Sequence, residues 1–330
     1  MHGNMTRAER FSYFFIFLVI VLAGALHLAP PLVTVLFSYF ALHKLNISKN
    51  RWLTVILFLV LIGTISYGIF YLVRQAIEAL PKIGSESIPS IVAYAQSKNI
   101  DLPFVDYESF KALIMDTAKD EFKVVGTFAR AATKQFVFLV IGAVVALGLF
   151  LNPSIDTDAR KRGPNLFTSI VDQITNRFAC FYESFERVMG AQLVISTVNT
   201  MLTAIFVLVI HLKHAGVVIG LTFLCGLLPI IGNLISNTII VCIAFTISPR
   251  AAIAALIFLI ALHKLEYFLN SKIIGERIKN PVWLTLLALI LGERLMGIPG
   301  MILAPVILHY IKIETSKLPA STAPTPVSTV

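Results

Sequence analysis

Apolar and polar segments alternate along the chain at lengths that suit a membrane protein. A helix that crosses a bilayer needs about 20 mostly apolar residues. Uninterrupted apolar segments predict membrane helices at residues 11–29, 31–45, 52–73, 136–151, 188–210 and 251–269. Pro30 and Pro31 separate the first two, because proline lacks a backbone N–H and clashes with the preceding helical turn.

Two further apolar segments, residues 217–247 and 282–311, are interrupted by glycine and proline. The first contains GLLPIIGN at residues 226–233, and the second contains GERLMGIPG at residues 292–300. Lipid cannot satisfy an open backbone, so such a break must be buried in protein or line a watery cavity. Paired interrupted helices point to the substrate site of secondary transporters. The pattern therefore favours a transporter with two broken, re-entrant hairpins.

The basic residues predict on which side of the membrane each loop lies. If each broken segment enters and leaves on one side, the cytoplasmic parts are the N-terminus, residues 43–51, 152–187 and 271–280, and the C-terminus. These parts hold fifteen Lys and Arg residues, whereas the short external loops hold two, Lys213 and Arg250. This bias agrees with the positive-inside rule. A complete crossing by segment 217–247 would instead place the basic residues of 271–280 outside.

Residues 74–134 form a polar insertion with eight basic and eight acidic residues. Pro81, Pro89 and Pro103 are expected to divide its first half into short pieces. Asp106 is a candidate N-cap, and the apolar spacing after it predicts an amphipathic helix that runs directly into segment 136–151. We expect a small helical domain outside the cytoplasm that packs on itself or on neighbouring subunits, with a binding role as the alternative.

Composition supports the membrane class and narrows the possible functions. The chain is 57% hydrophobic and 14% charged, with a mean hydropathy of +0.84, whereas soluble domains are about 25% charged. The net charge of +9 fits cytoplasmic loops better than a nucleic-acid partner. Cys180, Cys225 and Cys242 form no close pair, and no zinc, nucleotide-binding or metalloprotease motif occurs. We expect no cofactor, no metal and no enzymatic activity.

Ionisable residues within the membrane are costly and usually functional. His263 and Glu266 are three residues apart in segment 251–269, so they share a helix face and could relay protons. Asn270, one turn further along, joins them as a candidate for ion coupling. The alternative is structural, because this end of the segment lies near the cytoplasm, where Lys264 can extend its ammonium group to water.

Polar and small residues at the two breaks are the candidates for the solute pathway. Pro229 is expected to leave a helix carbonyl without a partner, which a polar solute could use. The amides after it could contact solute, cap the following half-helix, or do both. The acidic and basic pair at the second tip could instead neutralise one another. The candidates are Pro229, Gly232, Asn233, Ser236, Asn237, Glu293, Arg294, Gly297 and Gly300.

Three motifs give the chain a family resemblance. GAQL at residues 190–193, GLLPIIGN at 226–233 and GERLMGIPGMILAP at 292–305 resemble the autoinducer-2 exporter family of bacterial membrane proteins. Glu293 and Arg294 stand where that family usually has small and apolar residues. The resemblance implies export of the quorum-sensing signal autoinducer-2 or, as in other members, sodium or lithium/proton antiport. It also implies homo-oligomers, with pentamers as the expected form.

The sequence thus predicts an all-α, polytopic membrane protein with about eight transmembrane segments. The expected domains are membrane helices at 1–73, the polar insertion at 74–134, a membrane helix and cytoplasmic amphipathic segment at 135–187, the membrane core at 188–316 and a disordered tail at 317–330. The expected function is secondary transport of a small polar solute across the bacterial inner membrane by alternating access. The alternatives are a cation/proton antiporter and a non-transporting envelope scaffold that acts through the insertion.

Overall fold

The computed structural model describes residues 6–118, 125–152, 165–212, 214–228, 231–274 and 281–317. Within these ranges the regular structure consists of eleven α-helices and one short 3-10 helix, in agreement with the predicted all-α class. The chain forms two compact units. The terminal unit comprises Met1–His27, Ile155–Val188 and Glu276–Val330, and the central unit comprises Leu28–Ser154 and Met189–Gly275.

The predicted proline break after the first helix is confirmed. Helix α1 (Arg7–Ala25) starts at a capping box, in which Thr6 Oγ1 accepts from Glu9 N and the Glu9 carboxylate accepts from Thr6 N. It ends four residues before the predicted position 29. Helix α2 (Ala29–Leu45) carries proline in its first turn, where the missing N–H has no intrahelical partner to lose. The short 3-10 helix η1 (Asn46–Ser48) follows α2.

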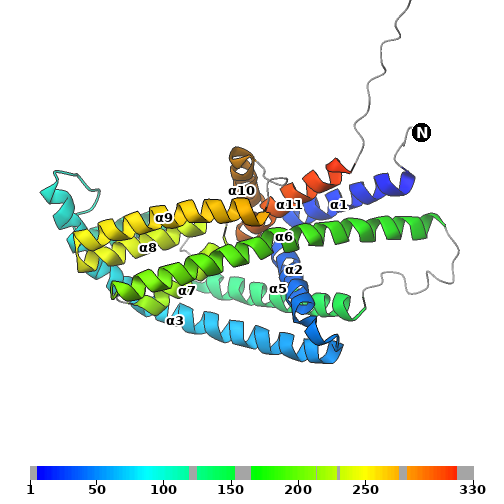
Figure 1. Cartoon of the computed structure of the whole chain (residues 1–330), viewed down its shortest axis with the longest axis horizontal. Coiled ribbons are helices and arrows are strands. Elements are labelled where there is room, and N and C mark those ends of the chain that lie inside the picture. Colours follow the sequence, from blue (N-terminus) through cyan, green and yellow to red (C-terminus); the bar gives the residue numbers. More distant parts are fainter. Residues whose placement is uncertain are drawn as a thin grey trace, which may run out of the picture. The chain divides into compact units, whose positions relative to one another are not determined.

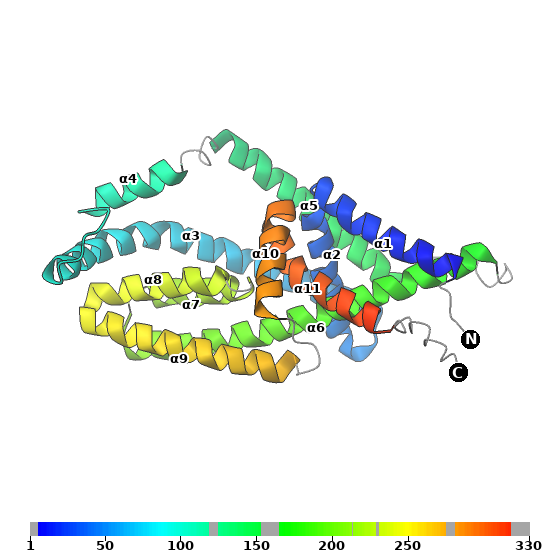
Figure 2. The same ribbon diagram turned by 90° about the horizontal axis from the view of Figure 1, so that it is seen from above.

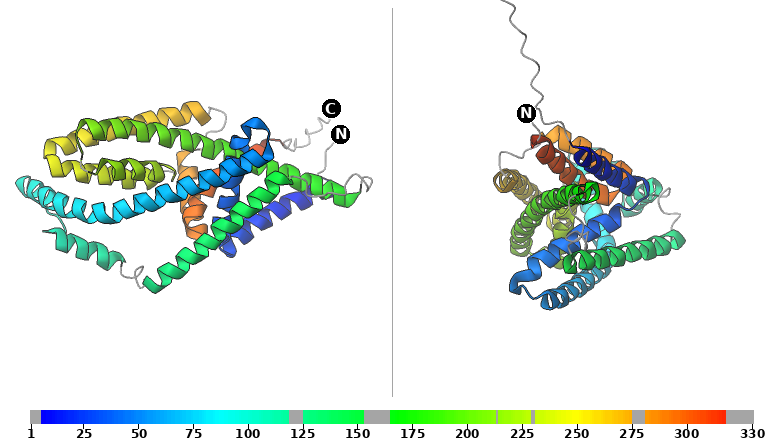
Figure 3. Two further views of the ribbon diagram at one scale, coloured as in Figure 1. Left: turned by 90° about the horizontal axis from the view of Figure 1, so that it is seen from below. Right: turned by 90° about the vertical axis from the view of Figure 1, so that its right-hand side faces the viewer.

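Helix α3 (Arg51–Ser97) is 47 residues long and continuous through Pro81 and Pro89 (Figure 3). The prediction that these prolines divide the insertion was therefore wrong. A proline removes one backbone hydrogen bond, but it does not remove the packing of the surrounding turns. Ala79 and Ile83, each two positions from Pro81, are buried with Ala76 in the apolar core of the central unit. Tertiary packing keeps the helix intact across the proline.

The predicted helix after Asp106 is present as α4 (Tyr107–Ala118). The side chain of Asp106 caps it, since Ser109 N donates to Asp106 Oδ1 at 2.7 Å and Asp106 N donates to Ser109 Oγ at 3.0 Å. The hydrogen bonds from Ser109 hold the pKa of the Asp106 carboxyl below its ordinary value. Helix α5 (Val125–Leu151) follows. The predicted direct connection between the two helices passes through residues 119–124, which lie outside the described ranges.

Helix α6 (Leu166–Val209) is a single helix of 44 residues that runs through position 187 without interruption. Its first half belongs to the terminal unit and its second half to the central unit. Polar residues such as Asp172 and Arg177 dominate the first turns, whereas the last turns are apolar. The chain therefore continues a membrane-type helix into a polar extension without a turn.

Both predicted broken segments are helix pairs. Helices α7 (Ala215–Gly226) and α8 (Ile231–Ile247) pack together in the central unit, beside α9 (Pro249–Ile274) (Figures 1 and 2). Helices α10 (Val282–Met296) and α11 (Ile298–Ser316) pack together in the terminal unit. Gly297 joins the latter pair with φ of +64°, a conformation that L-residues with side chains rarely adopt.

Four described segments are long and apolar enough to cross a membrane. They are Arg7–Ala25, Arg51–Ala79, Leu166–Val209 and Ile298–Ser316. Shorter apolar helices cover Gln135–Leu151, Ala215–Gly226 and Gly232–Ile247. Large apolar side chains remain exposed on these helices, for example Phe17 at 64% and Phe70 at 66%. An apolar exterior of this kind suits lipid, and the chain is a multi-pass membrane protein.

Candidate functional site: a polar cavity beside the first helix break

Two polar side chains of α6 satisfy the end of α7 at the first break. Gln192 Nε2 donates to Gly226 O at 2.6 Å, and Ser196 Oγ donates to Phe223 O at 2.8 Å. The last carbonyl groups of a helix have no intrahelical partner and need such donors when they are buried. The α7 end is thus held within protein, as a helix break at membrane depth requires.

The carbonyl expected to be free because of Pro229 has a partner. The helix carbonyl four residues before this proline is Cys225 O, and it accepts from Leu228 N at 2.8 Å. The prediction that this carbonyl is available to a solute was therefore wrong. The chain turns tightly enough after Gly226 that an amide before the proline replaces the missing one. Pro229 itself lies outside the described residues.

Glycine is required where the backbones of the hairpin meet. A Cβ placed at Gly232 would collide with the carbonyl group of Cys225, and it would lie 3.1 Å from Cys225 Cα. A Cβ at Gly226 would lie 2.5 Å from Ser196 Oγ. Backbone atoms cannot move aside as a flexible side chain can. Gly232 therefore allows the close approach of the two hairpin backbones, whereas Gly226 leaves room for the Ser196 side chain of α6.

Asn233 and Glu266 connect α8 to α9. The Asn233 amide donates to both carboxylate oxygens of Glu266, at 2.8 and 2.7 Å. The Glu266 side chain is 13% exposed, and His263 Nδ1 lies 3.9 Å from its Oε2. The His263 side chain is 74% exposed. Asn233 thus uses its amide nitrogen for an interhelical bond to a nearly buried carboxylate. It lies inside α8, two residues after the helix start at Ile231, and not at the N-cap.

These residues line a small cavity in the central unit. Its volume is about 10 Å³, which is the room that one water molecule needs. Leu259 and Leu262 form its apolar side. The polar groups around it come from four helices, and they are Asn199, Thr222, Asn233, Ser236, Asn237, His263 and Glu266. Seven polar side chains converge here between helices that are otherwise apolar, which makes this cavity the candidate functional site.

Comparison with known proteins decides the family. The profile of the AI-2E family transporters matches residues 10–319. The chain belongs to this family. The AI-2E family is a family of transporters and not of enzymes, which confirms the resemblance seen in the sequence and the expectation that the chain is not an enzyme.

A curated relative of the AI-2E chain is "Putative transport protein YdbI" of Bacillus subtilis (strain 168). The two are 30% identical over 136 residues, which is 40% of this chain and 39% of the relative. The similarity thus spans well under half of that protein. No solved structure is detectably similar to this chain.

The structure brings five of the predicted site residues of the AI-2E chain together: Asn233, Ser236, Asn237, His263 and Glu266. Gly232 lies at the backbone contact beside them. The side chain of Asn270 lies outside the described parts. Sequence reasoning missed Asn199 and Thr222. The signal for Asn199 was present, because α6 carries polar residues at helical spacing through an apolar segment.

The second break lies in the terminal unit. Gly300 and Gly292 meet at their backbones, since a Cβ at Gly292 would lie 2.5 Å from Gly300 O. Gly297 N donates to Glu293 O at 2.7 Å and closes the turn. The side chains of Glu293 and Arg294 are exposed. Among the described residues no ion pair joins these two, so the structure does not show the mutual neutralisation that was the alternative expectation.

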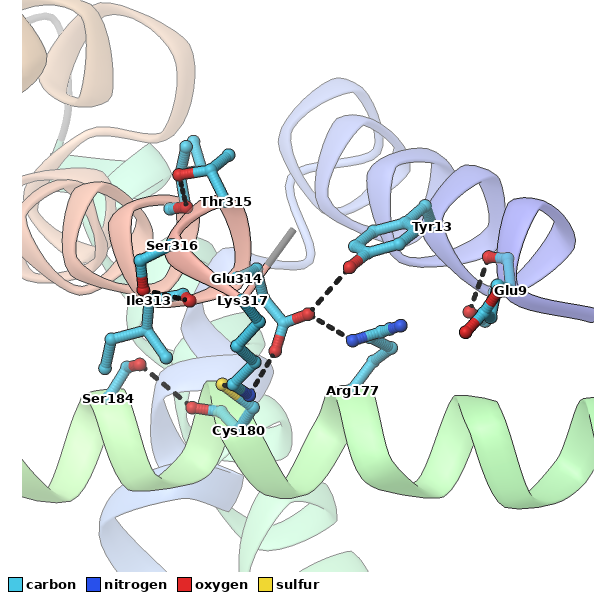
Figure 4. Close-up of polar contacts among 12 residues, drawn as sticks. Glu9, Tyr13, Arg177, Cys180, Ser184, Ile313, Glu314, Thr315, Ser316 and Lys317 are labelled. Atoms are coloured by element: carbon cyan, nitrogen blue, oxygen red, sulfur yellow. Dashed lines mark hydrogen bonds and ion pairs between the residues drawn. The ribbon is translucent and has the colours of Figure 1, made fainter. Parts of the chain in front are cut away.

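A buried carboxylate in the terminal unit was not predicted. Glu314 of α11 is 3% exposed and binds Arg177 of α6 and the Tyr13 hydroxyl of α1, the latter at 3.0 Å (Figure 4). Lys317 Nζ lies 2.8 Å from Glu314 Oε1. This hydrogen bond holds the pKa of the Lys317 ammonium above its ordinary value. The described residues contain no cluster of His, Cys, Asp or Glu suited to a metal ion.

Proposed function

We propose that this AI-2E family chain is a secondary transporter that exports a small polar solute of the autoinducer-2 type across the bacterial inner membrane. The observation that carries the proposal is the Asn233–Glu266 pair in a polar cavity beside the first helix break. Family membership supports transport in general. The nature of the solute rests on the sequence resemblance and on the polarity of the cavity.

The chemistry of the pair suits a site that opens and closes. A carboxylate among apolar helices is costly unless it has hydrogen-bond partners. Asn233 supplies two such contacts while the cavity holds no more than a water molecule. A polar solute that offers hydroxyl groups can replace the amide as donor to Glu266. The amide is then available to an acceptor on the same solute, so exchange of partners accompanies binding.

The arrangement in the membrane is part of the same proposal. Both helix pairs are re-entrant, and the chain has about eight transmembrane segments with cytoplasmic termini. The distribution of fifteen basic residues against two supports this topology. Residues 74–134 lie outside the cytoplasm and the chain assembles as a homo-oligomer, as the family resemblance implies. Alternating access moves the hairpins between an inward-facing and an outward-facing state.

Cation/proton antiport is the second candidate, and one contact favours it. His263 Nδ1 lies 3.9 Å from Glu266 Oε2, with the histidine exposed and the carboxylate nearly buried. An imidazolium group can hand a proton to such a carboxylate, and a sodium ion can compete for the same oxygens. In this case Glu266 carries the exchanged ion and not an organic solute.

Flux from proteoliposomes separates the two candidates. Vesicles loaded with autoinducer-2, and in parallel with radioactive sodium, are placed under an imposed pH gradient without ATP. We expect efflux of autoinducer-2 from the native chain and much less from Asn233→Ala. Sodium flux that depends on pH, and disappears in Glu266→Gln while autoinducer-2 does not move, would replace the exporter by the antiporter. The absence of both fluxes would refute transport of either solute.

A further inference from the structure

A stripe of polar residues follows one face of α6 past the first break. Gln192, Ser196, Asn199 and Thr203 recur at spacings of four, three and four residues, which places them on one side of the helix. Gln192 and Ser196 donate to carbonyl groups at the end of α7. Their bonds show that this face of α6 is directed at the hairpin. The rest of the stripe therefore continues along the same wall of the central unit.

The last two residues of the stripe are buried and incompletely satisfied. Asn199 is 4% exposed and its Oδ1 has no hydrogen-bond partner, and the same holds for Oγ1 of the fully buried Thr203. A threonine inside a helix commonly donates to the carbonyl four residues earlier. Thr200 does so to Ser196 O at 2.7 Å, whereas Thr203 does not. Buried polar groups nearly always have partners, so two exceptions on one helix face need a reason.

We propose that Asn199 contacts the transported solute and that Thr203 extends the polar route along α6. The inference rests on the proposed function, because it adds α6 to the helices that line the proposed solute site. Helix α6 is not part of the α7–α8 hairpin. Asn199 lines the same cavity as Asn233 and Glu266. A ligand that enters this cavity completes the hydrogen bonding that the closed structure leaves unfinished at Asn199.

The neighbouring groups define the chemistry of that ligand. The Thr222 hydroxyl donates to Val218 O at 2.8 Å, and the Ser236 hydroxyl donates to Asn233 O at 3.3 Å. Both hydroxyl protons are thus engaged within their own helices, and the oxygen lone pairs remain for a ligand. Together with Asn199 Oδ1 and the Glu266 carboxylate, these oxygens form a set of acceptors on the cavity wall. The matching ligand group is a hydrogen-bond donor, namely a hydroxyl or amino group on a small organic solute.

The unpaired acceptor also links binding to conformational change. In the closed state Asn199 Oδ1 is removed from water without compensation, which disfavours that state. A state in which solute donates to Asn199 does not carry this penalty. A ligand shifts a conformational equilibrium by its different affinity for the two states. A solute that donates to Asn199 therefore favours the occupied state of the site over the closed one.

Asn199→Leu tests this role, because leucine has a similar size and no polar atoms. We expect autoinducer-2 efflux from proteoliposomes to fall about tenfold or more, since a site that has lost a polar contact discriminates strongly. The thermal midpoint of the purified protein should stay constant or rise, because an unpaired buried group is replaced by an apolar one. A purely structural Asn199 would produce the opposite result, a lower midpoint. Thr203→Val should behave in the same way with a smaller loss of efflux.

Thr200→Val is the matched control, since the Thr200 hydroxyl is already satisfied by its own helix. It should leave efflux unchanged. If Asn199→Leu exports like the native chain while Asn233→Ala does not, the inference is overturned and the proposed function stands. If both variants export like the native chain, the hairpin cavity is not the route. The inference is then overturned together with the assignment of Asn233 and Glu266 to the solute site, although export itself is not refuted.

A second measurement does not depend on the identity of the solute. Asn199→Cys, in a chain whose three native cysteines are replaced by serine, is exposed to a small charged methanethiosulfonate reagent in lipid vesicles. We expect labelling, because a residue on a solute route becomes accessible to water when the site opens. Cysteine at position 195, which is buried and apolar in the native chain, should remain unlabelled. Absence of labelling at position 199 under both inward and outward pH gradients would overturn the inference.

Discussion

The side-chain amide of Asn233 bridges both carboxylate oxygens of Glu266, so that α8 and α9 are joined by one residue pair beside the helix break. The two residues are 33 positions apart in the chain and come from different helices. Hydrogen bonds to a charged group are stronger than those between neutral groups. The pair is therefore both a structural link and the most polar point of the cavity.

Asn233→Ala should weaken the solute affinity more than it slows turnover, and it should also lower stability. Removal of the amide leaves a nearly buried carboxylate without its donor, at a cost of roughly 1–3 kcal/mol. Thermal unfolding and the concentration dependence of efflux measure the two effects. Thr238→Ala on the exposed face of α8 is the control, and it should change neither. An unchanged affinity in Asn233→Ala would remove this residue from the solute pathway.

Gly232→Ala and Gly300→Ala should reduce transport more than they reduce the amount of folded protein. Each added Cβ meets backbone atoms of the partner helix, Cys225 in one case and Gly292 in the other, so the hairpins must separate. The comparison is efflux per folded molecule, with folding measured by size-exclusion chromatography of the purified protein. Gly148→Ala is the control, since a Cβ at that position would meet nothing within 4 Å. Efflux that falls only in proportion to folded protein would assign the hairpins a purely structural role.

Labelling of single cysteines tests the proposed topology. In a chain without native cysteines, a membrane-impermeant thiol reagent should reach positions 160 and 276 from the cytoplasmic side and position 213 from outside. The reason is the positive-inside bias, which places the loops around 160 and 276 in the cytoplasm only if the first broken segment is re-entrant. If positions 213 and 276 react from the same side, that segment crosses the membrane completely.

Local patterns in the sequence predicted most helices and their ends. The features that these patterns did not predict depend on packing between helices. The cap at Asp106 and the proline turn after α1 depend on neighbouring residues, so they could be recognised directly. Pro81 follows the same local rule but stays inside α3, because burial of Ala79 and Ile83 outweighs the lost hydrogen bond. Long-range information of this kind is not visible in a local pattern.

The candidate site likewise combines residues that local sequence identifies with contacts that depend on long-range packing. Glycine, proline and polar residues at a helix break identified Asn233, and a histidine three residues before a glutamate identified Glu266. Their direct contact depends on how α9 packs against α8, which no spacing reveals. Asn199 was missed because its significance depends on an oxygen without a partner. That property exists only once the surrounding helices are in place.

The capping of α4 should depend on pH. Hydrogen bonds from Ser109 depress the pKa of Asp106, so the folded helix favours the charged carboxylate. The contribution to stability is present above the ordinary pKa of an aspartate and is lost as the pH falls through the lower folded value. Hydrogen exchange of the α4 amides should therefore rise in that acidic range. Asp106→Asn, which retains the cap without the titration, should show no such rise.

Glu314→Gln should destabilise the terminal unit strongly without acting on the solute site itself. The carboxylate binds Arg177, Lys317 and the Tyr13 hydroxyl and thereby connects α1, α6 and α11. Arg177 is 12% exposed, so loss of its partner leaves a largely buried cation, at a cost of about 3–5 kcal/mol when such a pair is broken. We expect a clearly lower thermal midpoint of the purified protein.

Lys317→Ala should have a much smaller effect, because the Lys317 side chain is 54% exposed and water can solvate its ammonium group. Equal midpoints for Glu314→Gln and the native chain would show that the three helices are held together by apolar packing alone.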